Sequence, residues 1–135
     1  MREILFRGKR ADNGEWVESG NVFLGVKHKC IYIPNPDTDM RAKAYVCYEV
    51  IPATVGQYTG LTDKIGTKIF EGDIVKNIFN IPNKHYVIKY DLLLGAFIGE
   101  DDSTMHFTTF DGDSELFEII GNIHDNPELL KGERA

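Results

Sequence analysis

Two acidic runs come nearest to a metal-dependent active site in this sequence. They are Glu100-Asp101-Asp102 and the alternating carboxylates Asp111, Asp113 and Glu115. Clustered carboxylate oxygens bind divalent cations, and a bound cation can activate water for hydrolysis. The second run lacks the full twelve-residue spacing of a calcium loop, with its central glycine and terminal glutamate, and both runs fall where turns between strands are expected. Solvated turns are therefore favoured, and a hydrolase built on Asp111 and Asp113 ranks behind two binding functions.

The cysteines, histidines and serines lack the spacing of a catalytic or zinc-binding set. Cys30 and Cys47 are the only cysteines, and each lies inside an apolar run typical of a buried strand. His28 lies two positions before Cys30, but no Cys-x2-4-Cys or His-x3-5-His pair is present. The phosphate-binding loop, the nucleophile elbow and the His-Glu-x-x-His motif are also absent. The sequence therefore predicts no enzyme, no cofactor and no metal site.

A set of aromatic and polar side chains is the best candidate for a binding surface. Small β-barrels bind extended peptides through exposed aromatic rings that frame a shallow groove. We predict a partner-binding face formed by Trp16, Gln57, Tyr58, Thr59 and Phe70. Core packing is the competing interpretation, above all for Phe70, which stands between turn residues.

The charge of the chain bears on the kind of partner. Fifteen Lys and Arg residues against 21 Asp and Glu residues give a net charge of −6. This acidity opposes sequence-independent attachment to the phosphates of nucleic acids. A small basic patch of Arg7, Lys9 and Arg10 is the exception, although solvated positions on an edge strand explain it more simply. Together with Trp16 and Phe23, this patch is the candidate surface for binding single-stranded nucleic acid.

The composition is that of a globular protein, with 42% hydrophobic, 27% charged and 11% aromatic residues. One domain is the expectation for 135 residues, a length that can bury a core without a disulfide or a metal. The first residues lack a secretory signal, and no apolar stretch reaches the roughly 18 to 20 residues of a membrane span. We therefore expect a cytoplasmic protein without membrane association.

Short strands must position these side chains, because apolar residues alternate or cluster in runs and show almost no helical periodicity. The opening predicts a hairpin, with strands over 4–7 and 15–18 joined by a turn at Asp12-Asn13-Gly14. Further strands are expected over 21–26, 29–33, 43–51, 73–79, 86–90, 105–110 and 116–123, with a buried apolar run over 92–98. About five strands after Gly72 predict a small barrel, since closure removes exposed sheet edges.

The C-terminal segment has the signals of a short helix. Asn126 can cap it, Pro127 suits its first position, and Glu128 complements its positive end. The Pro- and Gly-rich stretch 52–72 is the candidate boundary within the chain. We expect a single domain over 1–135, with the alternative of an N-terminal β subdomain, 1–52, packed on a barrel, 53–130.

Segments spread over most of the chain resemble the YopX family of phage and prophage proteins. They are Ile4–Gly8, Asn13–Val17, Val55–Lys64, Lys68–Val75, Ile120–Ile123 and Asn126–Leu130. The resemblance implies a mainly β protein with one or more small SH3-like barrels, encoded by a phage or prophage and acting in the bacterial host. The activity of the family is not established, and no accepted catalytic residues are carried over. Ile65 departs from the Asn usual at that position, which puts the type of the following turn in question.

We therefore predict a non-enzymatic accessory module that binds a protein, either a second copy of itself or a host factor. An acidic β scaffold without a catalytic set is the reason for this prediction. Binding of single-stranded nucleic acid is the alternative function. The sequence identifies neither the partner nor the oligomeric state.

Overall fold

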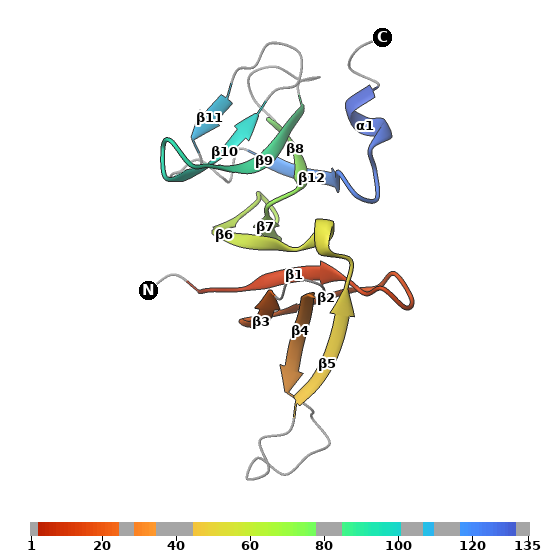
Figure 1. Ribbon diagram of the computed structural model, residues 1–135. Coiled ribbons are helices and arrows are strands. Elements are labelled where there is room, and N and C mark those ends of the chain that lie inside the picture. Colours follow the sequence, from red (N-terminus) through yellow and green to blue (C-terminus); the bar gives the residue numbers. More distant parts are fainter. Residues whose placement is uncertain are drawn as a thin grey trace. The chain divides into compact units, whose positions relative to one another are not determined.

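The structure is a computed structural model that describes residues 3–24, 29–34, 45–77, 85–100, 107–109 and 117–131 (Figure 1). These residues form a mainly β protein, as predicted, with almost no helix. The strands are β1 Phe6–Lys9, β2 Trp16–Ser19, β3 Asn21–Leu24, β4 Lys29–Pro34, β5 Tyr45–Val50, β6 Gly56–Thr62, β7 Lys68–Phe70, β8 Asp73–Asn77, β9 His85–Asp91, β10 Ala96–Glu100, β11 Phe107–Thr109 and β12 Phe117–Asn122. A 3-10 turn, η1, covers Pro52–Thr54, and a single helical turn, α1, covers Glu128–Lys131.

The chain divides into two compact units, residues 1–57 and 58–135, and the boundary falls within β6. The sequence of the first unit has eight Lys and Arg against seven Asp and Glu, which gives a net charge of +1. The second unit has seven against fourteen, which gives −7. The acidity of the chain therefore belongs to the second unit.

Two antiparallel arrangements of strands make up the first unit. β1 pairs with β2 across the turn after Arg10, and it also pairs with the first residues of β6. β3, β4 and β5 form a separate sheet with β4 in the middle. Ile31 of β4 and Val50 of β5 are buried and supply the apolar centre of this unit.

The position of Val50 explains why residue 8 is a glycine. A Cβ on Gly8 would lie 2.9 Å from the Val50 Cβ and 3.0 Å from both of its methyl carbons. The Val50 side chain therefore lies directly on the β1 backbone. Arg10 forms a β-bridge with Val50, and the Ala11 amide donates to the Glu49 carbonyl at 3.0 Å. The end of β1 is thus fixed to the end of β5.

A five-stranded antiparallel sheet in the order β11-β10-β9-β8-β12 is the main element of the second unit. Strands β8 to β11 form a meander, and β12 returns to pair with β8. Ile69, Val75, Ile88 and Phe117 form a buried cluster within the core of this unit. Within the described part of the chain no pairing joins β11 to β12, so the closed barrel expected from the sequence is not shown.

Two buried carboxylates hold the turns of the second unit. Asp63 Oδ1 accepts the amides of Ile65 and Thr67 at 3.1 and 2.9 Å. Asp73 Oδ2 accepts the Phe70 amide at 2.8 Å. Because a buried carboxylate requires hydrogen-bond donors, these bonds stabilise the loops on either side of β7. Asp63 and Asp73 therefore have a structural role in the Val55–Val75 region.

The turn after Asp63 forms with isoleucine at position 65. Gly66 takes the left-handed region, with φ of +88°, and its amide donates to the Asp63 carbonyl at 3.0 Å. Ile65 precedes this glycine and is exposed. Since Gly66 supplies a left-handed residue of the turn, isoleucine at position 65 is compatible with the turn.

The C-terminal segment lies directly on the backbone of β12. A Cβ on Gly121 would lie 2.6 Å from Asn126 Oδ1 and 2.9 Å from Leu129 Cδ1. The Asn126 Oδ1 also accepts the Asn122 amide at 3.3 Å. The absence of a side chain at Gly121 therefore allows the last residues to pack against the sheet.

The predicted buried run over 92–98 is wrong at its start. Residues 92–95 form the turn between β9 and β10, and Leu92 and Leu93 are almost completely exposed. The strand begins only at Ala96. Backbone hydrogen bonds to the Asp91 side chain fix this turn, so local turn chemistry overrides the apolar character of the leucines.

Candidate functional site

The candidate site begins with the turn between β1 and β2 in the first unit. Asn13 Oδ1 accepts the Glu15 amide at 3.0 Å, and the Gly14 amide donates to the Arg10 carbonyl at 3.0 Å. Gly14 has a left-handed φ of +74°, which suits glycine. The hairpin turn predicted from Asn13-Gly14 is confirmed, and it brings Arg10 close to two carboxylates.

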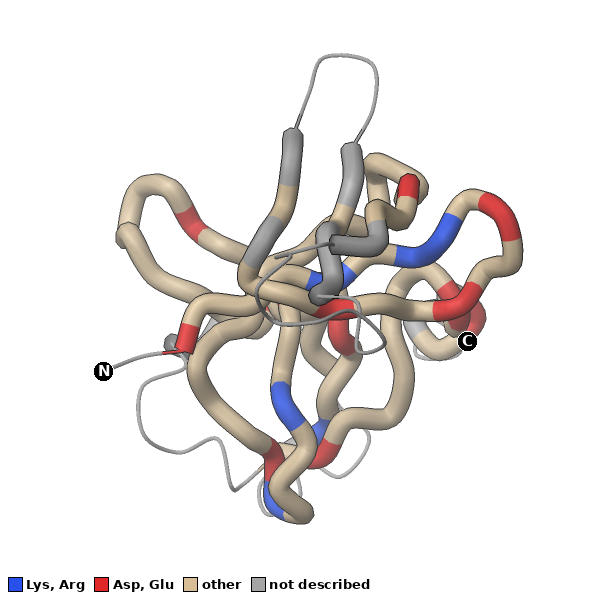
Figure 2. Tube along the Cα trace, turned by 90° about the horizontal axis from the view of Figure 1, so that it is seen from below, with Lys and Arg blue, Asp and Glu red and all other residues tan. Residues whose placement is uncertain are grey.

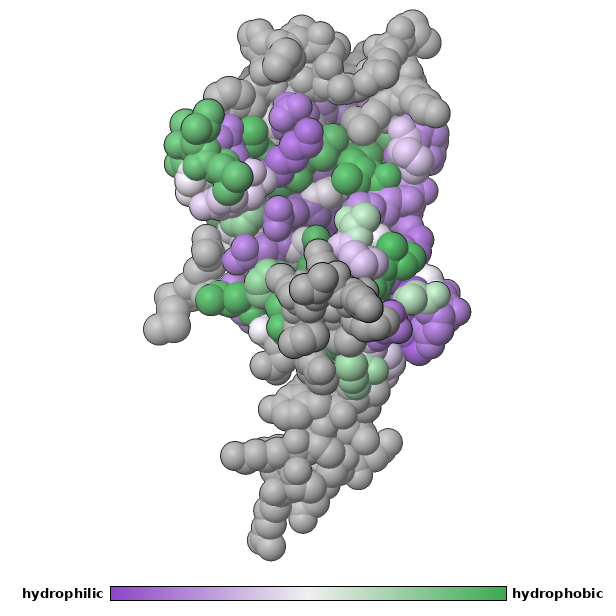
Figure 3. Space-filling view, in the orientation of Figure 1, coloured by the Kyte–Doolittle hydropathy of each residue, from purple (hydrophilic) through white to green (hydrophobic). Residues whose placement is uncertain are grey.

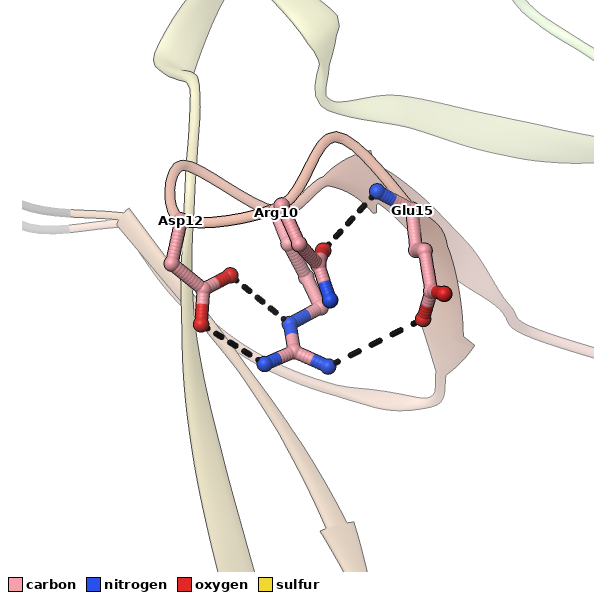
Figure 4. A network of polar contacts seen from close by, with 4 residues as sticks. Arg10, Asp12 and Glu15 are labelled. Carbon is pink, nitrogen blue, oxygen red and sulfur yellow. Dashed lines mark hydrogen bonds and ion pairs between the residues drawn. The ribbon is translucent and has the colours of Figure 1, made fainter.

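The Arg10 guanidinium is held by the carboxylates of its own turn (Figure 4). Nε and Nη2 donate to the two oxygens of Asp12 at 3.0 and 2.7 Å, and Nη1 lies 3.9 Å from a Glu15 oxygen. This two-pronged hydrogen bond lowers the pKa of the Asp12 carboxyl and raises that of Arg10. Figure 2 shows the basic residues at the end of β1 in blue, followed by the acidic residues of the loop between β1 and β2 in red. The positive charge of Arg10 is therefore compensated locally.

The same guanidinium covers an aromatic ring of β5. Arg10 Cζ lies 4.4 Å from the centroid of the Tyr48 ring, a distance typical of a cation–π contact. The backbone bonds between the end of β1 and β5 hold the two side chains at this separation. An open cleft of about 320 Å³ adjoins this contact. Its lining residues are Arg10, Ala11, Asp12, Cys47, Tyr48 and Glu49.

A second arginine–aromatic contact lies on the β1–β2 hairpin. The register places Lys9 opposite Trp16 and Arg7 opposite Glu18, so these four side chains share one face of the hairpin. Arg7 Cζ lies 4.7 Å from the centroid of the Trp16 ring. Trp16 is half-buried, so part of the ring faces solvent. Each cation of the predicted basic patch therefore lies beside a carboxylate or an aromatic ring; these cations are Arg7, Lys9 and Arg10.

The other residues of the predicted binding face lie in or near the core. Tyr58, Thr59 and Phe70 are only 7%, 5% and 2% exposed. The rings of Tyr58 and Phe70 contact each other, with their centroids 5.5 Å apart, and Thr59 Oγ1 donates to the Ile69 carbonyl at 2.8 Å. These three side chains stabilise the second unit and offer little surface to a partner. Gln57 is half-buried and ends the first unit.

Metal chemistry finds no support in the described residues. Among them, no group of three His, Cys, Asp or Glu side chains is close enough together to hold a metal ion. Asp111, Asp113 and Glu115 lie outside the described residues, as do His28 and the side chain of Phe23. Glu100 of the first acidic run forms an ion pair with Lys89 at 3.3 Å.

Tyr48 is the residue of this site that the sequence does not reveal. It is predicted only as a strand residue, because its contact with Arg10 depends on pairing between distant segments. The one local signal is Asp12, which follows Arg10 by two residues in a turn and can therefore reach its guanidinium.

No helix in the described part of the chain has the length and apolar character of a membrane span.

The fold and the site define a mainly β protein of two units, with two arginine–aromatic contacts in the first unit, of which Arg10–Tyr48 adjoins a cleft. The sequence model of a family described as YopX protein matches residues 5–131 of the 135. The chain therefore belongs to the YopX family, and the resemblance noted from the sequence is confirmed. No curated protein matches the chain.

Proposed function

We propose that this YopX family protein is a non-enzymatic module that binds another protein through the first unit. The observation that carries the proposal is the pair of half-buried rings, Trp16 and Tyr48, each covered by an arginine and one of them lining a cleft. Trp, Tyr and Arg are enriched among the hot spots of protein interfaces, and Trp and Tyr offer a large contact area with only two rotatable side-chain bonds. The partner is a host factor or a second copy of the chain.

The charges around the two rings bear on the choice between a protein partner and single-stranded nucleic acid. Arginines stacked on rings and a net charge of +1 in the first unit favour single-stranded nucleic acid. However, Arg10 is bound by Asp12 and approached by Glu15, and Arg7 faces Glu18 across the hairpin. Affinity for phosphates comes from cations that exchange counterions for the backbone, and compensated cations supply less of it. A protein partner is therefore favoured.

The same proposal includes an SH3-like architecture for the second unit and a location in the bacterial cytoplasm. An SH3-like architecture for the second unit is supported by its strand order, because a four-strand meander whose first strand pairs with the last strand is the connectivity of such barrels. A role in the cytoplasm of a bacterium that carries the phage or prophage follows from the family resemblance.

The test compares co-purified proteins from cells that express tagged variants. Trp16→Ala and Tyr48→Ala should each reduce recovery of the partner roughly tenfold, as expected for hot-spot rings. Ile65→Ala removes an exposed apolar side chain of the second unit and should leave recovery unchanged. If all three variants recover as much partner as the unmodified protein does, the proposal is contradicted. In parallel, filter binding of a single-stranded oligonucleotide at low salt, lost in Trp16→Ala, would favour the alternative.

A further inference from the structure

The turn between β9 and β10 presents three consecutive leucines to solvent. Leu92, Leu93 and Leu94 are 88%, 98% and 52% exposed. Figure 3 shows hydrophobic atoms gathered at the upper left, where Figure 1 draws this turn. Contiguous exposed apolar groups of this kind mark interaction sites on soluble proteins more often than they serve the fold. We call Leu92–Leu94 the leucine turn.

The leucine turn is held in a defined conformation. Asp91 Oδ1 accepts the amides of Leu93 and Leu94 at 2.8 and 3.2 Å, and the Gly95 amide donates to the Asp91 carbonyl at 2.8 Å. Gly95 has a left-handed φ of +64°, which closes the turn. The backbone conformation therefore directs the leucines outward, and their exposure belongs to the folded structure.

Side-chain contacts between β9 and β10 support the base of the turn. Tyr90 and Phe97 pack edge to face, with ring centroids 5.1 Å apart, and Phe97 is buried. Beyond them, Lys89 and Glu100 form an ion pair at 3.3 Å across β9 and β10. A preorganised apolar tip loses little conformational entropy when it binds, which favours its use as an anchor.

We propose that the leucine turn is a docking element, separate from the face around Trp16, that inserts into an apolar pocket of another protein rimmed by Lys or Arg. The convex tip requires a concave apolar acceptor. Asp91 stands at the base of the tip, and the unit that carries it has a net charge of −7. Basic residues on the rim of the pocket would complement this charge.

A second copy and a lipid surface fit less well. Two tips in mutual contact would join a few residues from each chain, whereas a stable interface uses roughly 20 to 30 residues a side. Each copy would also bring a unit of charge −7 toward the other. Three of the six residues that line the cleft of the first unit are charged, so this cleft is a poor match for the leucines. An anionic membrane would repel the same unit.

The test is photo-crosslinking from the turn in the full-length protein, expressed in cells. Leu93→benzoylphenylalanine should crosslink to one protein, at a site lined by apolar side chains and flanked by Lys or Arg. That protein, purified, should bind the unmodified chain, and Leu93→Asp should weaken binding at least tenfold. Ile65→Asp, at another exposed apolar position, should leave the affinity unchanged. Thermal unfolding of both variants should match the unmodified protein.

Several results would overturn this inference. They are crosslinks only between copies of the chain, no crosslinked protein at all, or binding of Leu93→Asp equal to that of the unmodified chain. Vesicles of phosphatidylcholine and phosphatidylglycerol that bind the unmodified chain and not Leu93→Asp would assign the turn to lipid instead. Trp16→Ala should leave binding at the turn unchanged, so the two proposed surfaces can fail separately.

Discussion

The Asp63 carboxylate accepts a hydrogen bond from the Ile119 amide, at 3.1 Å and across 56 residues of sequence. The other Asp63 oxygen accepts two amides of its own loop. The neighbouring Lys64 amide donates to the Phe117 carbonyl at 3.0 Å. A single buried side chain therefore ties the loop between β6 and β7 to strand β12.

Removing this carboxylate should destabilise the second unit. Asp63→Ala leaves three partly buried backbone donors without their acceptor, and we expect a loss of about 3 kcal/mol, the lower end of the roughly 1 to 3 kcal/mol that each fully buried donor would cost. Asp63→Asn keeps one acceptor oxygen and should cost less. Urea unfolding measures both, with Glu18→Ala as the control at an exposed carboxylate. A free energy of unfolding unchanged in Asp63→Ala would contradict this role.

The contact between Gly8 and Val50 predicts a size-dependent penalty in the first unit. Gly8→Ala places a methyl group 2.9 Å from Val50 Cβ, and overpacking of this kind costs about 1 to 3 kcal/mol. Combining it with Val50→Ala should destabilise by less than the sum of the two single changes. Gly66→Ala is the control, because it meets no atom within 4 Å and should cost about 1 kcal/mol through its left-handed φ alone. Strict additivity at Gly8 and Val50 would disprove the contact.

The ionisation of Asp12 should depend on Arg10. The hydrogen bond from Arg10 lowers the pKa of Asp12 in the folded protein. The stabilisation from this pair is therefore present above the pKa of an unfolded aspartate and is lost as the pH falls through the folded value. Arg10→Gln should return the Asp12 midpoint toward its ordinary value, as measured by carboxyl ¹³C NMR titration. Identical midpoints in both proteins would show that the pair does not form in solution.

A side chain at residue 121 should release the C-terminal segment. In Gly121→Ala the new Cβ would meet Asn126 Oδ1 and Leu129 Cδ1 at 2.6 and 2.9 Å. Because both atoms end flexible side chains, the segment should move while the sheet stays folded, at a cost of about 1 kcal/mol. Hydrogen exchange should accelerate at the Asn126 and Leu129 amides and stay unchanged at Ile88. Unaltered exchange at all three amides would argue against this packing.

Local patterns predicted much of the fold. The Asn13-Gly14 turn and the strands on either side of it follow from rules that act within a few residues. The leucines at 92–94 show where such rules compete, because an apolar run predicts a buried strand while Asp91 and Gly95 specify a turn. The turn forms, so the most exposed apolar surface of the described residues is not predicted from the sequence.

The candidate site could be predicted only in part. Trp16 follows a recognisable turn, and the structure leaves it half-buried. Tyr58 and Phe70 carry the same aromatic signal, but burial depends on the packing of β6 against β7, which residue type alone does not report. Tyr48 reaches Arg10 through the isolated β-bridge between Arg10 and Val50, a long-range contact that local patterns do not report.

The central claim is that the first unit binds a protein through the surface around Trp16. Trp16 is the only tryptophan of the chain, so its fluorescence reports on this surface directly. Titration with the purified partner should change the Trp16 emission and protect the ring from acrylamide quenching, and Tyr48→Ala should weaken this response. A single-stranded oligonucleotide at low salt should leave the emission unchanged. Emission that ignores a bound partner, or that responds to the oligonucleotide, would contradict the proposed function.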